Sequence, residues 1–404
     1  MTGDRPALST LLVAAALALA AAVSLGLARF SYALLLPPMR ADLDWSYLTA
    51  GAMNTVNAVG YLIGALLLPR VLSRHDARGV LLAGSGGAAL LLAAHGVVVG
   101  AGALFALRLL TGVASAAAFV AGSLLAARLA AGSDSHAAGG AKRPGAGLVL
   151  GIYYGGTGVG IIASAMLVPP IAARASAHAW QGAWIALGAT ALLATAVTRA
   201  FTAHLAVPRA SRAAHVRFRW TPFGFGLAGY FLFGLGYIGY MTFVITLLRE
   251  QRMGTTEIVA FYVLLGAAVI ASSWLWAGLL QRFRGGESLA LLNGLLAIAT
   301  VLPVLSAHPV AVFASGLLFG SVFLSVVAST TALVRHNLPP AAWSGGIGAF
   351  TIVFAAGQIV GPSLVGWVAD GLGGLVRGFV VSALVLAAGA MLASRQKPVA
   401  AATG

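Results

Sequence analysis

Long apolar segments separated by short polar ones run through the whole chain of 404 residues. A segment of about 20 apolar residues is long enough to cross a bilayer as a helix. Twelve such segments are predicted, at residues 8–37, 47–69, 78–96, 99–129, 146–173, 179–203, 222–248, 256–281, 287–306, 309–335, 343–369 and 373–394. The pattern therefore predicts an all-α polytopic membrane protein with short loops.

The start of the first segment resembles a secretory signal peptide, because Arg5 precedes a run of Ala and Leu. The apolar run continues to Leu36, which is longer than the apolar region of a signal peptide. We therefore expect this segment to be retained as the first spanning helix.

The composition excludes several classes of protein. The chain is 60% hydrophobic and 8% charged, whereas soluble domains have roughly 25% charged residues. Cysteine is absent, which excludes disulfides, thiolate metal sites and thiol nucleophiles. The eight histidines lie in predicted loops or at span ends, with no metal-binding pattern. We therefore expect neither a metal site nor any other cofactor.

The formal net charge of +15 indicates topology rather than a nucleic-acid partner, because the basic residues lie between the apolar segments. With the N-terminus in the cytoplasm, seventeen of the 24 Lys and Arg residues fall on the cytoplasmic side and five on the outer side. This bias follows the positive-inside rule. It predicts a bacterial inner-membrane protein with both termini in the cytoplasm.

A shift of 208 residues relates the two halves of the chain. Residues 103–112 and 311–320 share six identities in ten positions at this shift. The residues aligned in the first and seventh predicted spans are Gly26 with Gly234, Leu27 with Leu235, Tyr32 with Tyr240, and Asp42 with Glu250. Parallel repeats of six helices imply a ligand site between the halves near mid-membrane. We expect a six-helix bundle at 1–203, a basic cytoplasmic linker at 204–221, and a second six-helix bundle at 222–404.

Several motifs resemble those of the major facilitator superfamily. Arg108 followed by Gly112 looks like its Arg-containing fourth-helix motif, and residues 278–286 resemble its loop signature after helix eight. The segments similar to the YbfB/YjiJ-type branch are 26–39, 46–64 and 358–362. The resemblance covers essentially the whole chain. It implies the major facilitator fold and transport by alternating access, and it names no substrate.

Arg29 and Arg108 are the fixed charges predicted to lie inside spans, where a charge costs at least about 2.5 kcal/mol unless it is compensated. None of the nine acidic residues falls in the membrane interior. The resemblance implies that the first and fourth helices border the central cavity. We therefore predict a small organic anion as substrate, held by Arg through paired hydrogen bonds. In the alternative interpretation, Arg29 snorkels to the membrane surface and Arg108 donates to backbone carbonyls.

Polar and aromatic residues supply further cavity-lining candidates. Asn54, Asn57 and Tyr61 share one face of the second span, where they line the cavity or bond to a neighbouring helix. Aromatic residues at helical spacing in 230–240 either stack on a ligand or pack against other rings. The remaining candidates are Tyr32, Tyr154, Tyr237, Tyr240 and Gln358.

Asp42 and Glu250 are the candidates for gating or coupling, because they lie at outer span ends. Glu257 and Asp370 also lie at outer span ends and are the other acids available for proton coupling. The alternative role of all four is that of a solvated carboxylate at a helix end. Co-transport of an ion, substrate protonation, anion exchange and uniport all stay open, since the predicted interior holds no acid.

Two other functions are weighed against anion transport. A polytopic enzyme would need acids or histidines clustered at a membrane face, and the sequence shows no such cluster, so we expect no enzyme. Broad-specificity export of amphipathic or drug-like compounds is the alternative within transport, favoured by the aromatic stripe. We expect a monomer, because each chain contains both halves of the site.

Overall fold

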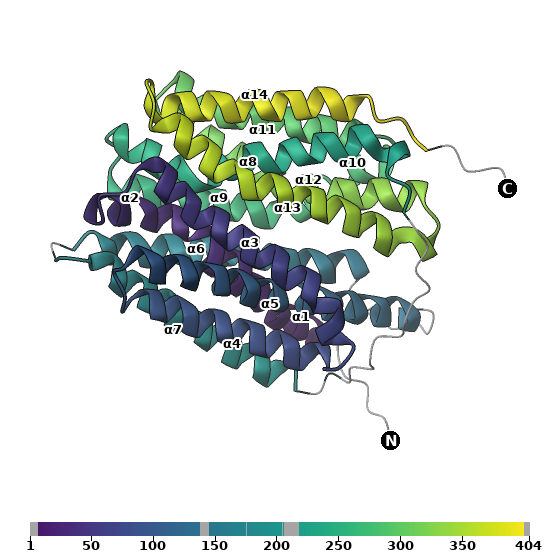
Figure 1. Cartoon of the computed structure of the whole chain (residues 1–404). Helices are drawn as coiled ribbons and strands as arrows, with labels where there is room; N and C mark the ends of the chain where they lie inside the picture. The colour runs from purple at the N-terminus through teal and green to yellow at the C-terminus, as the bar shows by residue number, and fades with distance from the viewer. Residues whose placement is uncertain (1–6, 138–144, 175, 204, 206–217, 400–404) are drawn as a thin grey trace. The chain divides into compact units, whose positions relative to one another are not determined.

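The computed structural model describes residues 7–137, 145–174, 176–203, 205 and 218–399, and these residues form helices and no strands (Figure 1). Apolar segments fold this way because each backbone polar group in a bilayer must be bonded within the protein. Twelve helices of the described residues are long and apolar enough to cross a membrane: Thr10–Asp42, Tyr47–Leu72, Ala77–His95, Ala101–Ala131, Gly147–Ala172, Ala179–Phe201, Thr221–Glu250, Thr255–Arg282, Glu287–Leu305, Pro309–Asn337, Gly345–Ala369 and Gly374–Ser394. The predicted all-α fold with twelve spans is confirmed.

The chain divides into two compact units. Unit 1 comprises Met1–Ser31 and Gly60–Ala210. Its helices are α1 (Ala7–Ala21), the π-helical segment η1 (Ala22–Phe30), the second part of α3 (Tyr47–Leu72), α4 (Ala77–His95), α5 (Ala101–Ala137), α6 (Ala146–Ala172) and α7 (Ala179–Phe201). Within this unit α4 packs against α5 and α7, and α6 packs against α1 and η1.

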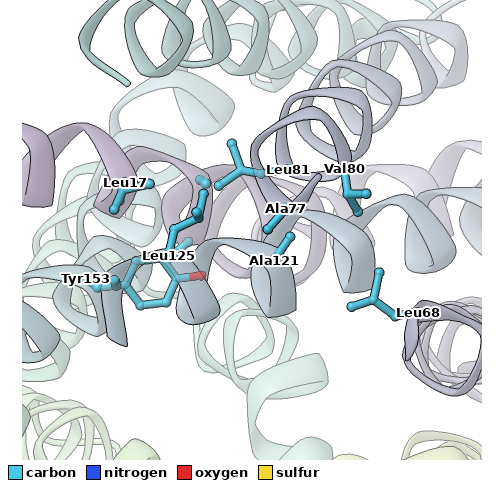
Figure 2. Packing of buried hydrophobic residues seen from close by; sticks show 11 residues of the cluster. Leu17, Leu68, Ala77, Val80, Leu81, Ala121, Leu125 and Tyr153 are labelled. Carbon is cyan, nitrogen blue, oxygen red and sulfur yellow. The ribbon is translucent and has the colours of Figure 1, made fainter. Parts of the chain in front are cut away.

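The core of unit 1 is a cluster of apolar side chains contributed by five helices. Figure 2 shows Leu17 of α1, Leu68 of α3, Leu81 of α4, Leu125 of α5 and Tyr153 of α6 packed together. The ring of Tyr153 is buried, and its hydroxyl donates to a backbone carbonyl of α5 at 2.6 Å. The cluster fixes the positions of the helices that carry the charged residues described below.

Glycines let α6 approach the first span very closely. A Cβ atom added to Gly26 would lie 2.5 Å from the Cα atom of Gly160. Gly156 meets the backbone of Ala18 in the same way. Small residues at such crossings let membrane helices gain dispersion contacts between their backbones.

The first span is not a continuous α-helix. Between α1 and α2 (Tyr32–Asp42), the segment η1 takes the wider π-helical form. The N–H of Ser31 donates to the carbonyl of Gly26 at 3.0 Å, a bond across five residues, and the Ser31 hydroxyl donates to Leu27 at 2.6 Å. π-helical turns are rare and often mark functional sites.

Unit 2 comprises Tyr32–Val59 and Ser211–Gly404. Its helices are α2, the first part of α3, η2 (Thr221–Phe223), α8 (Gly224–Glu250), α9 (Thr255–Leu275), α10 (Ala277–Arg282), α11 (Glu287–Leu305), α12 (Pro309–Asn337), η3 (Pro340–Ala342), α13 (Trp343–Ala369) and α14 (Gly374–Ser394). The long helix α8 packs against α2, α13 and α14, and α12 packs against α9 and α11.

The compact units differ in extent from the predicted six-helix bundles. Residues 32–59 belong to the predicted bundle at 1–203, but they pack in unit 2. A sequence repeat groups residues by their register, whereas a compact unit groups them by contact. The two six-helix bundles therefore stay a prediction, and most of the predicted linker at 204–221 lies outside the described residues.

Candidate functional site

Arg29 lies in η1, near the middle of the first span, and its side chain is 4% exposed. Its guanidinium carbon lies 5.6 Å from the centroid of the Tyr61 ring, which belongs to the part of α3 in unit 1. A guanidinium over an aromatic face is stabilised by the ring quadrupole, more so away from water. A snorkelling side chain would keep its charged end at the surface, whereas this one is buried.

Arg108 projects from α5 toward the same π-helical segment. Its side chain is completely buried, and its Nη1 donates to the carbonyl of Ala28 at 2.8 Å. Its guanidinium carbon also lies 5.8 Å from the ring of Trp184 on α7. This geometry matches the interpretation of Arg108 as a donor to the backbone. Arg108 therefore supports the turn that carries Arg29.

A histidine that no sequence pattern singles out completes this region of unit 1. The ring of His95, at the end of α4, stacks on Trp184 with centroids 4.4 Å apart. The His95 ring is buried, and its Nδ1 lies 2.7 Å from the carbonyl of Leu91. The Trp184 ring thus contacts both the His95 ring and the Arg108 guanidinium, and only the three-dimensional packing brings these residues together.

The polar residues of the second span are divided between the two units. Asn54, in unit 2, is buried and donates to the hydroxyl of Thr242 on α8 at 2.7 Å. Asn57 is buried in the same unit, whereas Tyr61 is partly buried and belongs to unit 1. For Asn54 the contact is the interhelical hydrogen bond that the sequence offered as one of two roles.

The aromatic candidates of unit 2 pack mainly on one another. Tyr237 stacks on Phe233 with centroids 4.7 Å apart, and Gln358 of α13 donates to its hydroxyl. Tyr240 stacks on Phe319 at 4.0 Å and exchanges a hydrogen bond with Ser315 at 2.8 Å. These contacts are those of a packed aromatic cluster with polar edges.

Two further candidates lie apart from these groups. Tyr32 is buried in unit 2, where its hydroxyl donates to the carbonyl of Ala50 at 2.8 Å. Tyr154 is 37% exposed on α6 and contacts Tyr153 edge to face at 5.2 Å. The structure therefore groups Arg29, Tyr61 and Arg108 in unit 1, and it groups Tyr237 with Gln358 in unit 2.

The acidic candidates lie at helix ends. Asp42 is exposed at the last residue of α2, and Glu250 is exposed at the last residue of α8. Glu250 accepts a hydrogen bond from the Tyr47 hydroxyl at the start of α3. Among the residues that the structure describes, no group of three His, Asp or Glu side chains is arranged to hold a metal ion.

Asp370 makes contacts that the sequence did not predict. Its carboxylate accepts the backbone N–H of Tyr47 at 2.7 Å and that of Leu48 at 2.9 Å. The guanidinium of Arg40 covers the Tyr47 ring at 3.8 Å. The sequence offered Asp370 as an acid for proton coupling or as a solvated carboxylate, and neither role indicated these partners, which lie more than 300 residues away.

Comparisons with known proteins agree with this architecture. Residues 21–394 match the family described as uncharacterised MFS-type transporter YbfB. No curated protein matches the chain. A bacterial homologue of the human lysosomal transporter Spinster, solved in an inward-facing and unoccupied conformation, has a TM-score of 0.72 at 13% identity, over 97% of this chain and 98% of that one.

Two other solved structures show the same fold. The nucleoside transporter NupG has a TM-score of 0.70 at 15% identity, over 96% of this chain and 100% of that one. The human organic anion transporter MFSD10 (TETRAN) has a TM-score of 0.62 at 15% identity, with the same coverage. The chain thus belongs to the YbfB-type family of the major facilitator superfamily, and it is a multi-pass membrane transporter, not an enzyme.

Proposed function

We propose that this transporter carries a small organic anion by alternating access and that Arg29 binds the anion. The observation that carries the proposal is the buried guanidinium of Arg29 in the π-helical turn of the first span, next to the Tyr61 ring. A positive charge at this depth is costly unless an opposite charge or water compensates it. A guanidinium also forms paired hydrogen bonds with a carboxylate or a phosphate, so an anionic substrate suits Arg29.

The distribution of charge supports an anion rather than a cation. Arg29 and Arg108 are the charged residues farthest from the ends of the described spans. The acids of the described helices lie at or near helix ends, among them Asp76, Glu250 and Asp370. A lipophilic or metal cation would meet no carboxylate at the depth of Arg29, whereas a carboxylate or phosphate would be attracted there.

The two arginines have different roles in this proposal. Arg108 directs Nη1 to the Ala28 carbonyl and is enclosed by protein on all sides. Arg29 is the neighbour of Ala28 in the chain, so the bond made by Arg108 fixes the turn from which Arg29 projects. Arg108 is a positioning residue, and Arg29 is the residue that contacts the substrate.

The fold itself does not select the substrate. The similar structures include a nucleoside transporter and an organic anion transporter, and one fold supports many functions through its sites. The anion is proposed from the charges of this chain. The basic bias of the loops supports a bacterial inner-membrane location with both termini in the cytoplasm, and the internal repeat supports a monomer.

The test is uptake by proteoliposomes that contain the purified protein. A thermal-shift screen against organic acids, nucleosides, sugars and lipophilic cations first identifies the stabilising compound. We expect an organic acid, and we expect Arg29→Gln to lower its uptake about tenfold or more, since a hydrogen bond between charged groups contributes roughly 1.5–3 kcal/mol. Arg29→Lys keeps the charge but not the paired geometry and should give an intermediate rate.

The matched control is Arg377→Gln, which removes an exposed arginine at the start of α14. This variant should transport at the wild-type rate. Unchanged uptake of the organic acid by the Arg29→Gln variant would contradict the proposal.

Broad-specificity export is the second candidate, and the stacked rings of unit 2 favour it. Phe354 stacks on Tyr230 at 4.9 Å and on Phe233 at 5.3 Å, which extends the aromatic cluster along α8. Such rings can stack on flat amphipathic compounds. Stabilisation by lipophilic cations alone, with transport lost in Phe354→Ala and retained in Arg29→Gln, would establish export in place of anion transport.

A further inference from the structure

In unit 2, the end of α12 is fixed against the loop that joins α10 to α11. The Nδ1 atom of His336, near the end of α12, lies 3.0 Å from the carbonyl oxygen of Phe283. The side-chain amide of Asn337, the last residue of α12, donates to the carbonyl of Arg284 at 2.7 Å. Two successive residues of the helix thus hold two successive residues of the loop.

The residues that follow α14 are bonded to the same loop. Gln396 is buried, and its carbonyl accepts the N–H of Gly286 at 2.8 Å. Its side-chain oxygen accepts the N–H of Gly226, in the first turn of α8, at 3.0 Å. The N–H of Val399 donates to the side chain of Asn337 at 2.6 Å. The chain beyond α14 is therefore part of the folded unit, and it joins α8 and α12 to the loop.

These hydrogen bonds gather basic side chains at one end of unit 2. The residues beside the bonded positions form a basic cluster of Arg282, Arg284, Arg335, Arg395 and Lys397. All five side chains are exposed. Positive charges held close together by the backbone raise the local potential, which attracts an anion.

The acids of unit 2 do not balance the basic cluster. Among the residues that the structure describes, Glu287 is the acid at this end of the unit. Its carboxylate lies against the loop, since a Cβ atom added to Gly285 would be 2.7 Å from Oε2 of Glu287. The other described acids of the unit lie at its opposite end, and they are Asp42, Asp44, Glu250, Glu257 and Asp370. With five basic residues and one acid, the cluster keeps a net positive charge.

Aromatic and apolar side chains flank the basic cluster. The guanidinium carbon of Arg335 lies 5.0 Å from the centroid of the Trp343 ring. Trp220, just before the start of α8, is 48% exposed, and Met391, one turn before Arg395, is 64% exposed. Tryptophan is enriched at the level of lipid headgroups. Exposed apolar side chains next to basic ones favour a ligand that has both an acyl chain and a negative charge.

We propose that the basic cluster of unit 2 binds the headgroup of an anionic phospholipid, with the acyl chains of the lipid beside the exposed apolar side chains. Arginine holds a phosphate through paired hydrogen bonds, and basic pockets between spanning helices bind lipid phosphates. The phosphate bridges the loop at 283–286, the end of α12 and the residues after α14. Binding therefore stabilises the folded unit.

The first test measures the thermal unfolding midpoint of delipidated protein in a non-ionic detergent. Phosphatidylglycerol and cardiolipin should raise the midpoint, because a ligand that binds only the folded state stabilises it. Phosphatidylcholine, which has no net charge, should leave the midpoint unchanged. Inorganic phosphate and glycerol 3-phosphate supply the charge without acyl chains and should have no effect at the same concentrations. Equal stabilisation by these soluble phosphates would overturn a lipid as the ligand.

The second test removes charge from the basic cluster. The triple variant R282Q/R284Q/R335Q should need about a hundredfold more phosphatidylglycerol for half-maximal stabilisation. The reason is that each basic residue near an anionic lipid contributes about 1 kcal/mol, or about fivefold in affinity. Because these side chains are exposed, the variant should fold, and size-exclusion chromatography and the midpoint without lipid check that it does.

Unit 1 supplies a matched control variant with the same loss of charge. R70Q/R74Q/R199Q removes three exposed arginines from α3, the turn after it and α7. This variant should keep the lipid dependence of the wild type. An equal loss of lipid affinity in both triple variants would indicate general attraction between a basic protein and anionic lipid, and it would overturn the site. The measurement needs no substrate, so its outcome is independent of whether Arg29 binds an anion.

Discussion

The first and seventh spans hold equivalent positions in the 208-residue repeat, yet they are built differently at one turn. In the first span, residues 22–30 form the π-helical segment that carries Arg29. The equivalent residues 230–238 are part of the continuous helix α8, and Tyr237 replaces Arg29. One span thus presents a charge on an irregular backbone, and the other presents a phenol on a regular one.

The fourth and tenth spans differ in a matching way. Arg108 of α5 supports η1 through the Ala28 carbonyl. Its equivalent in the repeat is Gly316 of α12, where an added Cβ would lie 2.5 Å from the ring of Phe261. The first repeat uses this position to fix a charged turn, whereas the second uses it to admit an aromatic ring. Two differences between the repeats, Tyr237 in place of Arg29 and Gly316 in place of Arg108, therefore leave the second repeat uncharged where the first is charged.

The largest expected effect concerns the close glycine contacts that the first and seventh spans share. Gly26 meets the Cα of Gly160, and the equivalent Gly234 meets the carbonyl of Phe354 at 2.6 Å. Because backbone atoms cannot move aside, we expect Gly26→Ala and Gly234→Ala each to destabilise the protein by about 3 kcal/mol or more. The measurement is the thermal unfolding midpoint in detergent.

Gly294→Ala is the control for both glycine variants, because an added Cβ there meets no atom within 4 Å. This variant should be as stable as the wild type or slightly more stable, since alanine favours helix by about 1 kcal/mol over glycine. Equal midpoints for G26A and G294A would show that the close crossing of η1 and α6 is not required.

The next effect tests the role assigned to Arg108. Arg108→Met keeps much of the side-chain volume but removes the donor to Ala28, so we expect a loss of roughly 1.5–3 kcal/mol in stability together with a loss of transport. Arg29→Gln should lower transport without a comparable loss of stability. An R108M protein that is fully stable but inactive would instead identify Arg108 as a direct substrate ligand.

The smallest effect belongs to the second repeat. Tyr237→Phe removes the hydroxyl bonded by Gln358 and keeps the ring stacked on Phe233. We expect a loss of about 0.5–1.5 kcal/mol in stability and uptake of the organic acid close to the wild-type rate. A strong loss of uptake in Y237F would place this phenol in the substrate site and remove the proposed asymmetry between the repeats.

The spans were predictable because membrane insertion depends on local apolar length. The predicted segment 287–306 corresponds to Glu287–Leu305, for example. The π-helical turn was not predictable, because an ordinary α-helix would also accommodate the residues of Ala22–Phe30. Its close contact with α6 involves Gly160, which lies more than 130 residues away.

The hydrogen-bond partners of the site residues could not be predicted from the sequence, for a related reason. Arg108 bonds to a backbone carbonyl, and every residue has one, so no sequence pattern could indicate Ala28. Asn54 was predictable as a polar residue within a span, whereas its partner Thr242 was not. Asp370 stood out as one of several acids at helix ends, and only the fold brings it to Tyr47.

Helix length has a consequence for the lipid around this protein. The third span of each repeat is short: α4 and α11 have 19 residues each, or about 28 Å of helix. The hydrocarbon core of a bilayer is about 30 Å thick, so neither helix has length to spare for tilting. A thicker bilayer creates hydrophobic mismatch at these two helices first. A change in membrane thickness therefore affects α4 in unit 1 and α11 in unit 2, which hold the same position in the repeat.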